Sequence, residues 1–302
     1  MKFLLFADFH HYPHVFICGT QEHLHEMQKR AEEEGCDFII HAGDYTHGPS
    51  EFPDIVREYN DFHIPSYHIL GNHDSDRTPL SETLSMYNMP AGYYYFDCKG
   101  YRIIVCDPNY YRDGEEFVHY ELKNYFAHGP ERDWMPPEQL AWLEKTIDEA
   151  PGRCILISHE SFERANGVKN RDEVQRILRA ANEKCHGKVI LCINGHHHTD
   201  YIRILDNICY FDVNSTCYHY LRKPHECYPP ELVAEKRGVN QTLAYTDPLY
   251  AVVTVEGSSI TIKGTTSSTY MGLTAADTGN DSYDGCGRCI DATCQSAHIE
   301  LL

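Results

Sequence analysis

The segment at residues 1–11, MKFLLFADFHH, joins a short apolar run to two polar side chains, Asp8 and His10. Residues 2–6 have the length and composition of a buried β-strand, and both side chains follow its end. The same arrangement recurs four times further along the chain. Apolar runs at residues 37–41, 65–70, 154–158 and 189–194 precede, in order, Gly43-Asp44, Gly71-Asn72-His73-Asp74, His159 and Gly195-His196-His197-His198.

Aspartate, asparagine and histidine therefore lie just past the ends of five predicted strands. In open α/β sheets the loops at the carboxyl ends of strands converge on one crevice, so these side chains are expected to lie close together. Carboxylate, amide and imidazole groups together suit Mn, Fe or Zn. In an extended segment residues i and i+2 point the same way, which predicts that Asp8 pairs with His10, and His196 with His198, on one ion.

Each of these motifs alone also occurs as an ordinary polar turn. Asn and Gly tolerate left-handed backbone, so the Gly71-Asn72-His73-Asp74 motif has a purely structural interpretation. The three consecutive histidines could likewise be incidental. Five such motifs at successive strand ends are not explained by turns, and they predict a metal centre. Its candidate ligands are Asp8, His10, Asp44, Asn72, His73, His159, His196 and His198.

The segments between the motifs alternate between helical and strand patterns, which predicts an α/β fold. Helices are expected at residues 21–34, between the N-cap Thr20 and the stop signal Gly35, and at 54–61, 137–150 and 171–184. A hairpin is expected at residues 93–107, and further strands at 201–205, 208–213, 250–256 and 259–264. Residues 108–135 and 218–247 are predicted to be long loops near the site.

The five motifs, in this order, make the chain similar to the calcineurin-like metallophosphoesterase superfamily. The resemblance covers roughly residues 1–265, taken as one domain, and implies a four-layer αββα sandwich with two mixed β-sheets flanked by helices. It also implies a division of the ligands between two ions. One ion would take Asp8, His10, Asp44 and His198, and the other Asp44, Asn72, His159 and His196, with Asp44 as the bridge.

Two neighbouring divalent or trivalent cations can bind one water between them and lower its pKa, so that a bridging hydroxide attacks phosphorus. This chemistry makes the expected activity a metal-dependent hydrolysis of phosphate esters. His73 directly follows a predicted ligand, so its ring is expected to face the phosphate and to protonate the leaving group. Asp74 is expected to orient His73.

Departures from the family pattern bear on the substrate. Protein Ser/Thr phosphatases of this group carry Asp-Arg-Gly shortly after the Gly-Asp motif, whereas this chain reads Gly43-Asp44-Tyr45-Thr46-His47-Gly48. That form, together with Arg77, resembles the bacterial cyclic-nucleotide-phosphodiesterase-like branch. His159 is followed by Glu160, where that branch often has a second histidine, so the pocket there is expected to differ.

A phosphodiesterase is the expected activity, because only Arg77 has a claim to lie beside the centre and a phosphomonoester usually needs more arginines. Arg77 is either a phosphate contact or a member of a surface ion pair. The alternatives for the whole chain are a phosphomonoesterase or nucleotidase, and a catalytically idle scaffold with the same fold.

Charge and composition exclude some other classes. The chain carries 45 acidic and 26 basic residues, a net charge of -19, which argues against binding to a nucleic-acid polymer. Small anionic substrates remain compatible, because bound cations reverse the local field. No apolar stretch approaches the ~18 residues of a membrane span, and no signal peptide is recognisable. Most of the 13 cysteines lie in apolar runs, so a reduced, cytoplasmic protein is predicted.

Residues 266–302 are predicted to form a cysteine-bearing C-terminal tail. Its residues Cys286, Cys289, Cys294 and His298 lie close enough in sequence to bind an additional zinc ion. The alternative is a tail that packs against the domain without metal.

Overall fold

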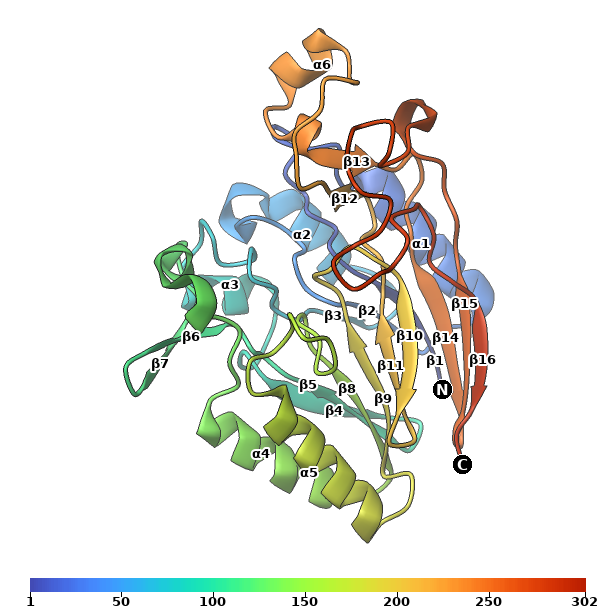
Figure 1. The fold of residues 1–302 in the computed structure, drawn as a ribbon. Helices are drawn as coiled ribbons and strands as arrows, with labels where there is room; N and C mark the ends of the chain where they lie inside the picture. Colours follow the sequence, from blue (N-terminus) through green and yellow to red (C-terminus); the bar gives the residue numbers. More distant parts are fainter.

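Two six-stranded mixed sheets form the centre of the protein in a computed structural model that describes residues 1–302 (Figure 1). The first sheet has the order β16 (Ala297–Glu300), β15 (Ser259–Gly264), β14 (Ala251–Glu256), β1 (Lys2–Phe6), β2 (Phe38–His41), β3 (Ser66–Tyr67). The second has the order β10 (Tyr201–Leu205), β11 (Ile208–Asp212), β9 (Val189–Asn194), β8 (Arg153–Ile157), β5 (Tyr101–Val105), β4 (Tyr94–Cys98).

Helices cover the outer face of each sheet. The first sheet packs against α1 (Gln21–Glu34), α2 (Pro53–Asn60) and α3 (Leu80–Met86). The second packs against α4 (Pro137–Asp148) and α5 (Arg171–Lys184), which Figure 1 shows side by side. The inner faces of the two sheets share a core of 28 buried residues. The predicted four-layer αββα sandwich is therefore confirmed.

Strand β1 shows why the central strands are apolar on both faces. Phe3 and Leu5 belong to the core between the sheets, whereas Leu4 and Phe6 belong to the core under α1 and α2. Successive side chains of a strand point to opposite faces, so a strand in a middle layer must be apolar throughout. Each fully buried side chain of this size contributes roughly 1.5–3 kcal/mol relative to exposure.

Parallel pairing brings the carboxyl ends of the inner strands together. β1, β2 and β3 are parallel in the first sheet, and β5, β8, β9 and β11 are parallel in the second. The segments that follow β1, β2, β8 and β9 therefore leave the sandwich at one end. β3 is only two residues long, shorter than the strand predicted at residues 65–70.

The two predicted long loops contain regular structure of their own. Residues 108–135 include the hairpin of β6 (Tyr110–Asp113) and β7 (Glu116–His119) and the 3₁₀ segment η2 (Asn124–Glu131). Residues 218–247 include β12 (Tyr218–Tyr220), α6 (Pro230–Glu235), η3 (Val239–Gln241) and β13 (Thr242–Ala244). The sequence did not predict these elements, because segments of three to eight residues are too short for a periodic pattern.

The C-terminal tail continues the central core beyond residue 265. After the short η4 (Tyr270–Gly272), β16 pairs with β15 at the edge of the first sheet. Ala292, Cys294, Ile299 and Leu301 are members of the core between the sheets. Figure 1 shows this last strand at the end of the molecule that also holds the N-terminus.

The predicted zinc ligands of the tail do not come together. Cys294 is buried in the core, whereas Cys286 and Cys289 are exposed. His298 lies on β16, where its ring contacts Thr261 and Glu300. All 13 cysteines are free thiols. Of the two alternatives, the structure therefore favours a tail that packs against the domain, because pairing of β16 places Cys294 and His298 in different environments. Among the helices, none is both long and apolar enough to cross a membrane.

Candidate metal centre

One half of the ligand cluster is formed by side chains that follow β1 and β9. Asp8 Oδ1 lies 3.1 Å from His198 Nε2 and 3.7 Å from His10 Nε2. The two imidazole nitrogens, His10 Nε2 and His198 Nε2, are 3.1 Å apart. All three residues are buried. Three potential donor atoms thus face one small volume.

The other half is formed around Asp44, which follows β2. Asp44 Oδ2 lies 3.1 Å from His159 Nε2 and 3.7 Å from His10 Nε2, so this carboxylate reaches both halves. His159 Nε2 lies 3.2 Å from His196 Nδ1. Asn72 lies beside them, and its amide nitrogen donates to Tyr125 Oη at 3.4 Å. The structure therefore brings the predicted ligands together at one end of the sandwich.

The backbone that presents these side chains is left-handed rather than extended. Positive φ angles occur at Asp8 (50°), His10 (44°), Asp44 (53°), His196 (69°) and His198 (51°). Non-glycine residues in this region cost on the order of 1–3 kcal/mol each and cluster at functional sites. The extended geometry that predicted the pairs was wrong. His196 faces His159, whereas His198 faces Asp8 and His10, so the two histidines serve different halves.

Glycines make room for the cluster at two strand ends. Gly43 has φ of 89°, and a Cβ there would lie 2.4 Å from His159 Nδ1. A Cβ on Gly71 would lie 2.2 Å from Asp44 Oδ1. Both distances are far below van der Waals contact, so only glycine allows His159 and Asp44 to approach these turns. Gly43 and Gly71 are therefore required for the geometry of the site.

Backbone carbonyls orient two of the imidazole rings. His198 Nδ1 donates to the carbonyl of Tyr218 at 2.6 Å, and His159 Nδ1 donates to the carbonyl of Ala42 at 2.7 Å. A proton held on Nδ1 leaves Nε2 with its lone pair directed at the cluster. Tyr218 begins β12, so the segment at residues 218–247 contributes directly to the site.

Electrostatics keep Asp8 and Asp44 ionised and hold His10 and His196 neutral. Burial raises the pKa of Asp8, but the neighbouring His198 and His10 more than offset this and hold it well below its ordinary range. Burial lowers the pKa of His10 to about 3 and that of His196 to about 4. His159 differs, because Asp44 outweighs its burial and raises its pKa well above the usual value. Ionised carboxylates and neutral imidazoles are the forms that bind metals.

The donor set fits a pair of transition-metal ions. Asp8 Oδ1 and Asn72 Oδ1 are buried oxygens without a hydrogen-bond partner, and Asp8 Oδ1 faces the ring nitrogens of His10 and His198. A buried oxygen that accepts nothing costs about 1–3 kcal/mol unless another partner is supplied. Two carboxylates, one amide and four imidazoles form a mixed oxygen and nitrogen set that suits Mn, Fe or Zn.

His73 lies at the edge of the cluster and is oriented by Asp76. The backbone N–H of His73 donates to Asp44 Oδ1 at 2.8 Å, and its ring Nδ1 donates to Asp76 Oδ2 at 2.8 Å. Tyr125 Oη donates to Asp76 Oδ1 at 3.0 Å. Burial lowers the pKa of His73, but Asp44 and Asp76 outweigh it and raise the pKa above its ordinary value. The ring is 21% exposed, so it can meet a substrate.

The prediction that Asp74 orients His73 was wrong. The Asp74 carboxylate accepts backbone N–H groups of Gly71, Asp44, Tyr45 and Thr46 at 2.7–3.1 Å, and the Tyr87 hydroxyl at 2.6 Å. With five donors on two oxygens, Asp74 joins the loop after β2 to the loop after β3. It therefore fixes the position of Asp44 rather than that of His73.

His47 is a buried member of the site that the sequence interpretation passed over. Its Nε2 lies 3.0 Å from His10 Nδ1. Its ring packs between Tyr12 and His73, with centroids 4.7 Å and 4.5 Å away. The only sequence signal was its place three residues after Asp44, where a turn residue would serve equally well.

Arg77 lies on the outer side of this stack. Its guanidinium pairs with Glu51 at 2.8 Å and lies 5.2 Å from the centre of the Tyr12 ring. Tyr12, Glu51 and Arg77 line a cavity of about 460 Å³, to which Ala234 and Glu235 of α6 also contribute. Of the two interpretations of Arg77, the structure shows the surface ion pair, which lies in a cavity whose Tyr12 stacks on His47.

Glu160 is a further buried carboxylate beside the cluster. It directly follows His159, is fully buried, and neither carboxylate oxygen has a hydrogen-bond partner. Its carboxylate lies within 4.8 Å of ring nitrogens of His159 and His196. Burial raises its pKa to about 8. Glu160 thus adds an acidic wall on the His196 side, where the sequence already predicted a different pocket.

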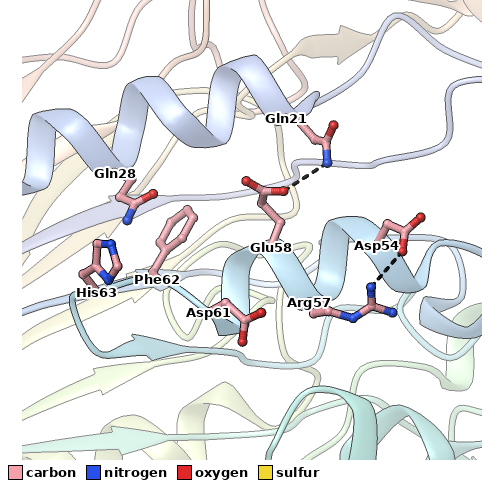
Figure 2. Close-up of a pocket in the computed structure, with 8 residues that line it drawn as sticks. All are labelled: Gln21, Gln28, Asp54, Arg57, Glu58, Asp61, Phe62 and His63. Atoms are coloured by element: carbon pink, nitrogen blue, oxygen red, sulfur yellow. Dashed lines mark hydrogen bonds and ion pairs between the residues drawn. The ribbon is translucent and has the colours of Figure 1, made fainter.

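A separate groove lies outside the site, between α1 and α2 (Figure 2). Its volume is about 440 Å³, and Gln21 of α1 donates to Glu58 of α2 across it at 3.0 Å. Asp54 and Asp61 also line it. None of the predicted ligands does, so this groove is no part of the cluster.

Comparisons with known proteins agree with this architecture. A manganese-dependent ADP-ribose/CDP-alcohol diphosphatase from Oryza sativa subsp. japonica is 27% identical over 181 residues. The match covers 48% of this chain and 55% of that protein, so it spans about half the length of this relative. The crystal structure of a dimetal phosphatase from Danio rerio is similar in fold, with a TM-score of 0.60 at 15% identity, over 87% of this chain and 95% of that one.

The family model described as calcineurin-like phosphoesterase matches residues 1–200, which include all seven predicted ligands and His73. The matched part contains β1, β2, β8 and β9, whose ends carry the cluster. On this match, the chain belongs to the calcineurin-like phosphoesterase family.

Proposed function

We propose that the protein is a hydrolase of phosphate esters that depends on two metal ions. The observation that carries this proposal is the convergence of seven donor residues from the five loops after β1, β2, β3, β8 and β9, with Asp44 within reach of both halves. Asp8, His10, Asp44 and His198 would hold one ion, and Asp44, Asn72, His159 and His196 the other. When bound, such a pair supplies an activated water and charge stabilisation at phosphorus.

The chain's own residues divide the remaining work. Asp44 shares its carboxylate between the halves, and its Oδ1 accepts the His73 backbone N–H, so the ligand loop and the acid loop are fixed together. The His73 ring faces the open side of the cluster and can give a proton to the leaving oxygen. Asp76, held in turn by Tyr125, keeps His73 Nδ1 occupied and leaves Nε2 to face the substrate.

A phosphodiester is the proposed substrate class. Arg77 and Arg237 line the cavity beside Tyr12, and Arg77 is already paired with Glu51. A phosphomonoester would bring two charges to a centre whose neighbouring Arg77 is already neutralised by Glu51, whereas a diester brings one. Tyr12 and α6 would hold the group on the far side of the diester, and Arg77 would contact that group at the cavity entrance.

A diphosphate-bridged substrate is the second candidate. The relative from Oryza sativa is named as a diphosphatase for ADP-ribose and CDP-alcohols. Such molecules place a second phosphate and a nucleoside beyond the reacting phosphorus. The cavity of about 460 Å³ beside Tyr12 has the size for such a group.

Metal content tests the centre itself. Protein purified in the presence of manganese should hold about two equivalents per chain by elemental analysis, given the two-metal arrangement of the ligands. Asp44→Asn should lose metal from both halves and lose hydrolysis of bis-p-nitrophenyl phosphate. Asp61→Asn, an exposed carboxylate, is the control and should change neither. Full activity of Asp44→Asn, or of the exhaustively chelated protein, would refute the two-metal proposal.

Substrate class is tested separately, with the same metal loaded throughout. We expect kcat/KM for bis-p-nitrophenyl phosphate or a cyclic nucleotide to exceed that for p-nitrophenyl phosphate. ADP-ribose belongs in the same panel, and a preference for it would select the diphosphate alternative. A clear preference for the monoester would overturn the diester proposal and leave the metal centre standing. No turnover of any phosphate ester by metal-loaded protein would favour the idle scaffold.

A further inference from the structure

Four arginines line a cavity of about 300 Å³ on the second sheet's side of the molecule. They come from the loop after β8, the start of α5, strand β10 and the C-terminal tail. The residues on which the argument depends are Arg164, Arg171, Arg203 and Arg288, with Glu163 and Tyr201. The chain has 45 acidic against 26 basic residues, so four guanidinium groups around one cavity oppose the overall charge. Like charges repel at this range unless something neutralises them.

Two of the four arginines are already neutralised. Arg164 is buried and pairs with Asp212 at 3.2 Å and with Asp284 of the tail. Arg203 pairs with Glu163. These two pairs hold the walls of the cavity together and leave little charge for a ligand.

The other two have no carboxylate partner. Arg171 donates only to the carbonyl of Ala165, at a long 3.4 Å. The Arg288 guanidinium lies 3.6 Å from the centre of the Tyr201 ring, and its side chain makes no hydrogen bond or ion pair. Stacking on an aromatic face fixes the plane of a guanidinium and leaves its N–H edge free. The cavity therefore presents two uncompensated cations, one of them preorganised.

The tail loop that carries Arg288 is tied to the body of the protein. Asp284 accepts the backbone N–H groups of Cys286 at 2.8 Å and Arg288 at 2.7 Å. The same carboxylate pairs with Arg164 and accepts the Thr199 hydroxyl at 3.1 Å. The Asp284 carboxylate thus sets both the shape of the tail loop and the position of the cavity wall.

We propose that this cavity is a second anion site, distinct from the metal centre, which binds a phosphate-type oxyanion between Arg171 and Arg288. Planar guanidinium forks match the oxygen geometry of phosphate and form strong charge-assisted hydrogen bonds with it. The groove between α1 and α2 provides a contrast within the same molecule (Figure 2). There Asp54, Glu58 and Asp61 surround one arginine, so an anion would be repelled.

Binding of inorganic phosphate to the metal-loaded full chain tests the site. Calorimetric titration at low salt should show that Arg171→Gln/Arg288→Gln binds one phosphate fewer per chain than the unaltered protein. Hydrolysis of bis-p-nitrophenyl phosphate should be unchanged, because neither arginine belongs to the metal cluster. Arg288→Lys should weaken the same phosphate at least tenfold while retaining it, since lysine keeps the charge but not the planar fork.

The control is Arg30→Gln/Arg57→Gln, which makes the same change in net charge at two exposed arginines of α1 and α2. It should keep the full number of bound phosphates. The proposal is overturned if the Arg171/Arg288 variant binds as many phosphates as the unaltered protein, or if the control loses as many. A parallel loss of metals or of hydrolysis would assign the effect to the metal centre instead. If the unaltered, metal-loaded protein shows no hydrolysis but the difference in bound phosphate persists, the proposed function is refuted and this site is not.

Discussion

At the scale of single residues, a position directly after a strand predicted which side chains belong to the site. It did not predict which of them hydrogen-bond to each other. Asp44, His159 and His198 could be predicted as neighbours because parallel strands end together. The partner of His73 could not, because Asp74 and Asp76 are equally plausible from spacing alone. The backbone decides between them. Asp74 turns inward to five donors, and Asp76 is left to face the ring.

The pairing of His73 with Asp76 predicts a graded loss of activity. His73→Ala should lower kcat by ~10²–10⁴-fold if the ring is the acid. Asp76→Asn should lower it less, by ~10–100-fold, because the ring remains but its tautomer and orientation are no longer fixed. Both losses should be larger for a poor leaving group such as an alkoxide than for nitrophenolate. Both variants should keep their metals.

Rate measurements across leaving groups, with metal content measured on the same samples, check this prediction. A rate for Asp76→Glu that is closer to the original rate than that of Asp76→Asn would further support a positioning role. An equal loss for good and poor leaving groups would remove His73 from the acid role. Loss of metal from Asp76→Asn would instead make Asp76 part of the metal centre.

At the scale of elements, the length of a helix or strand decided whether it could be predicted from the sequence. The helices α1, α2, α4 and α5 and the hairpin of β4 and β5 agree with their predicted positions to within a few residues. β16 was not predicted, since its four residues follow a polar segment of about thirty. Its place at the edge of the first sheet depends on pairing with β15, which is a tertiary contact and leaves no local pattern.

The packing of β16 predicts that its two faces respond differently to truncation. Ile299 is 7% exposed within the core between the sheets, so Ile299→Ala should lower the free energy of unfolding by about 2–5 kcal/mol. His298→Ala, the neighbour on the exposed face, should change it by less than about 0.5 kcal/mol. Chemical denaturation of both variants checks this. Similar effects at the two positions would contradict the pairing, and a zinc-dependent loss on His298→Ala would restore the tail zinc site.

At the scale of the whole molecule, the net negative charge opposes the binding of anionic substrates. The net charge of -19 weakens attraction for any polyanion, and the sequence alone predicted this. The structure shows how positive character can still arise locally. The arginine cavity gathers cations from four separate segments, and the ligand cluster would become positive when it binds metal ions. Neither cluster is visible in composition, because each depends on loops that the sandwich brings together.

The ligand cluster should also make the stability of the whole fold depend on metal. Its buried, unpartnered oxygens destabilise the metal-free protein, and any ion that binds only the folded state adds RT ln(1 + [L]/Kd). For each site, that is about 2.7 kcal/mol when manganese is at one hundred times its Kd. Thermal unfolding should therefore shift upward with manganese in the unaltered protein and in Asp54→Asn, which removes an exposed carboxylate. The shift should be largely absent in Asp44→Asn. An equal shift in all three proteins would mean that manganese merely screens the acidic surface, and it would contradict a specific site at Asp44.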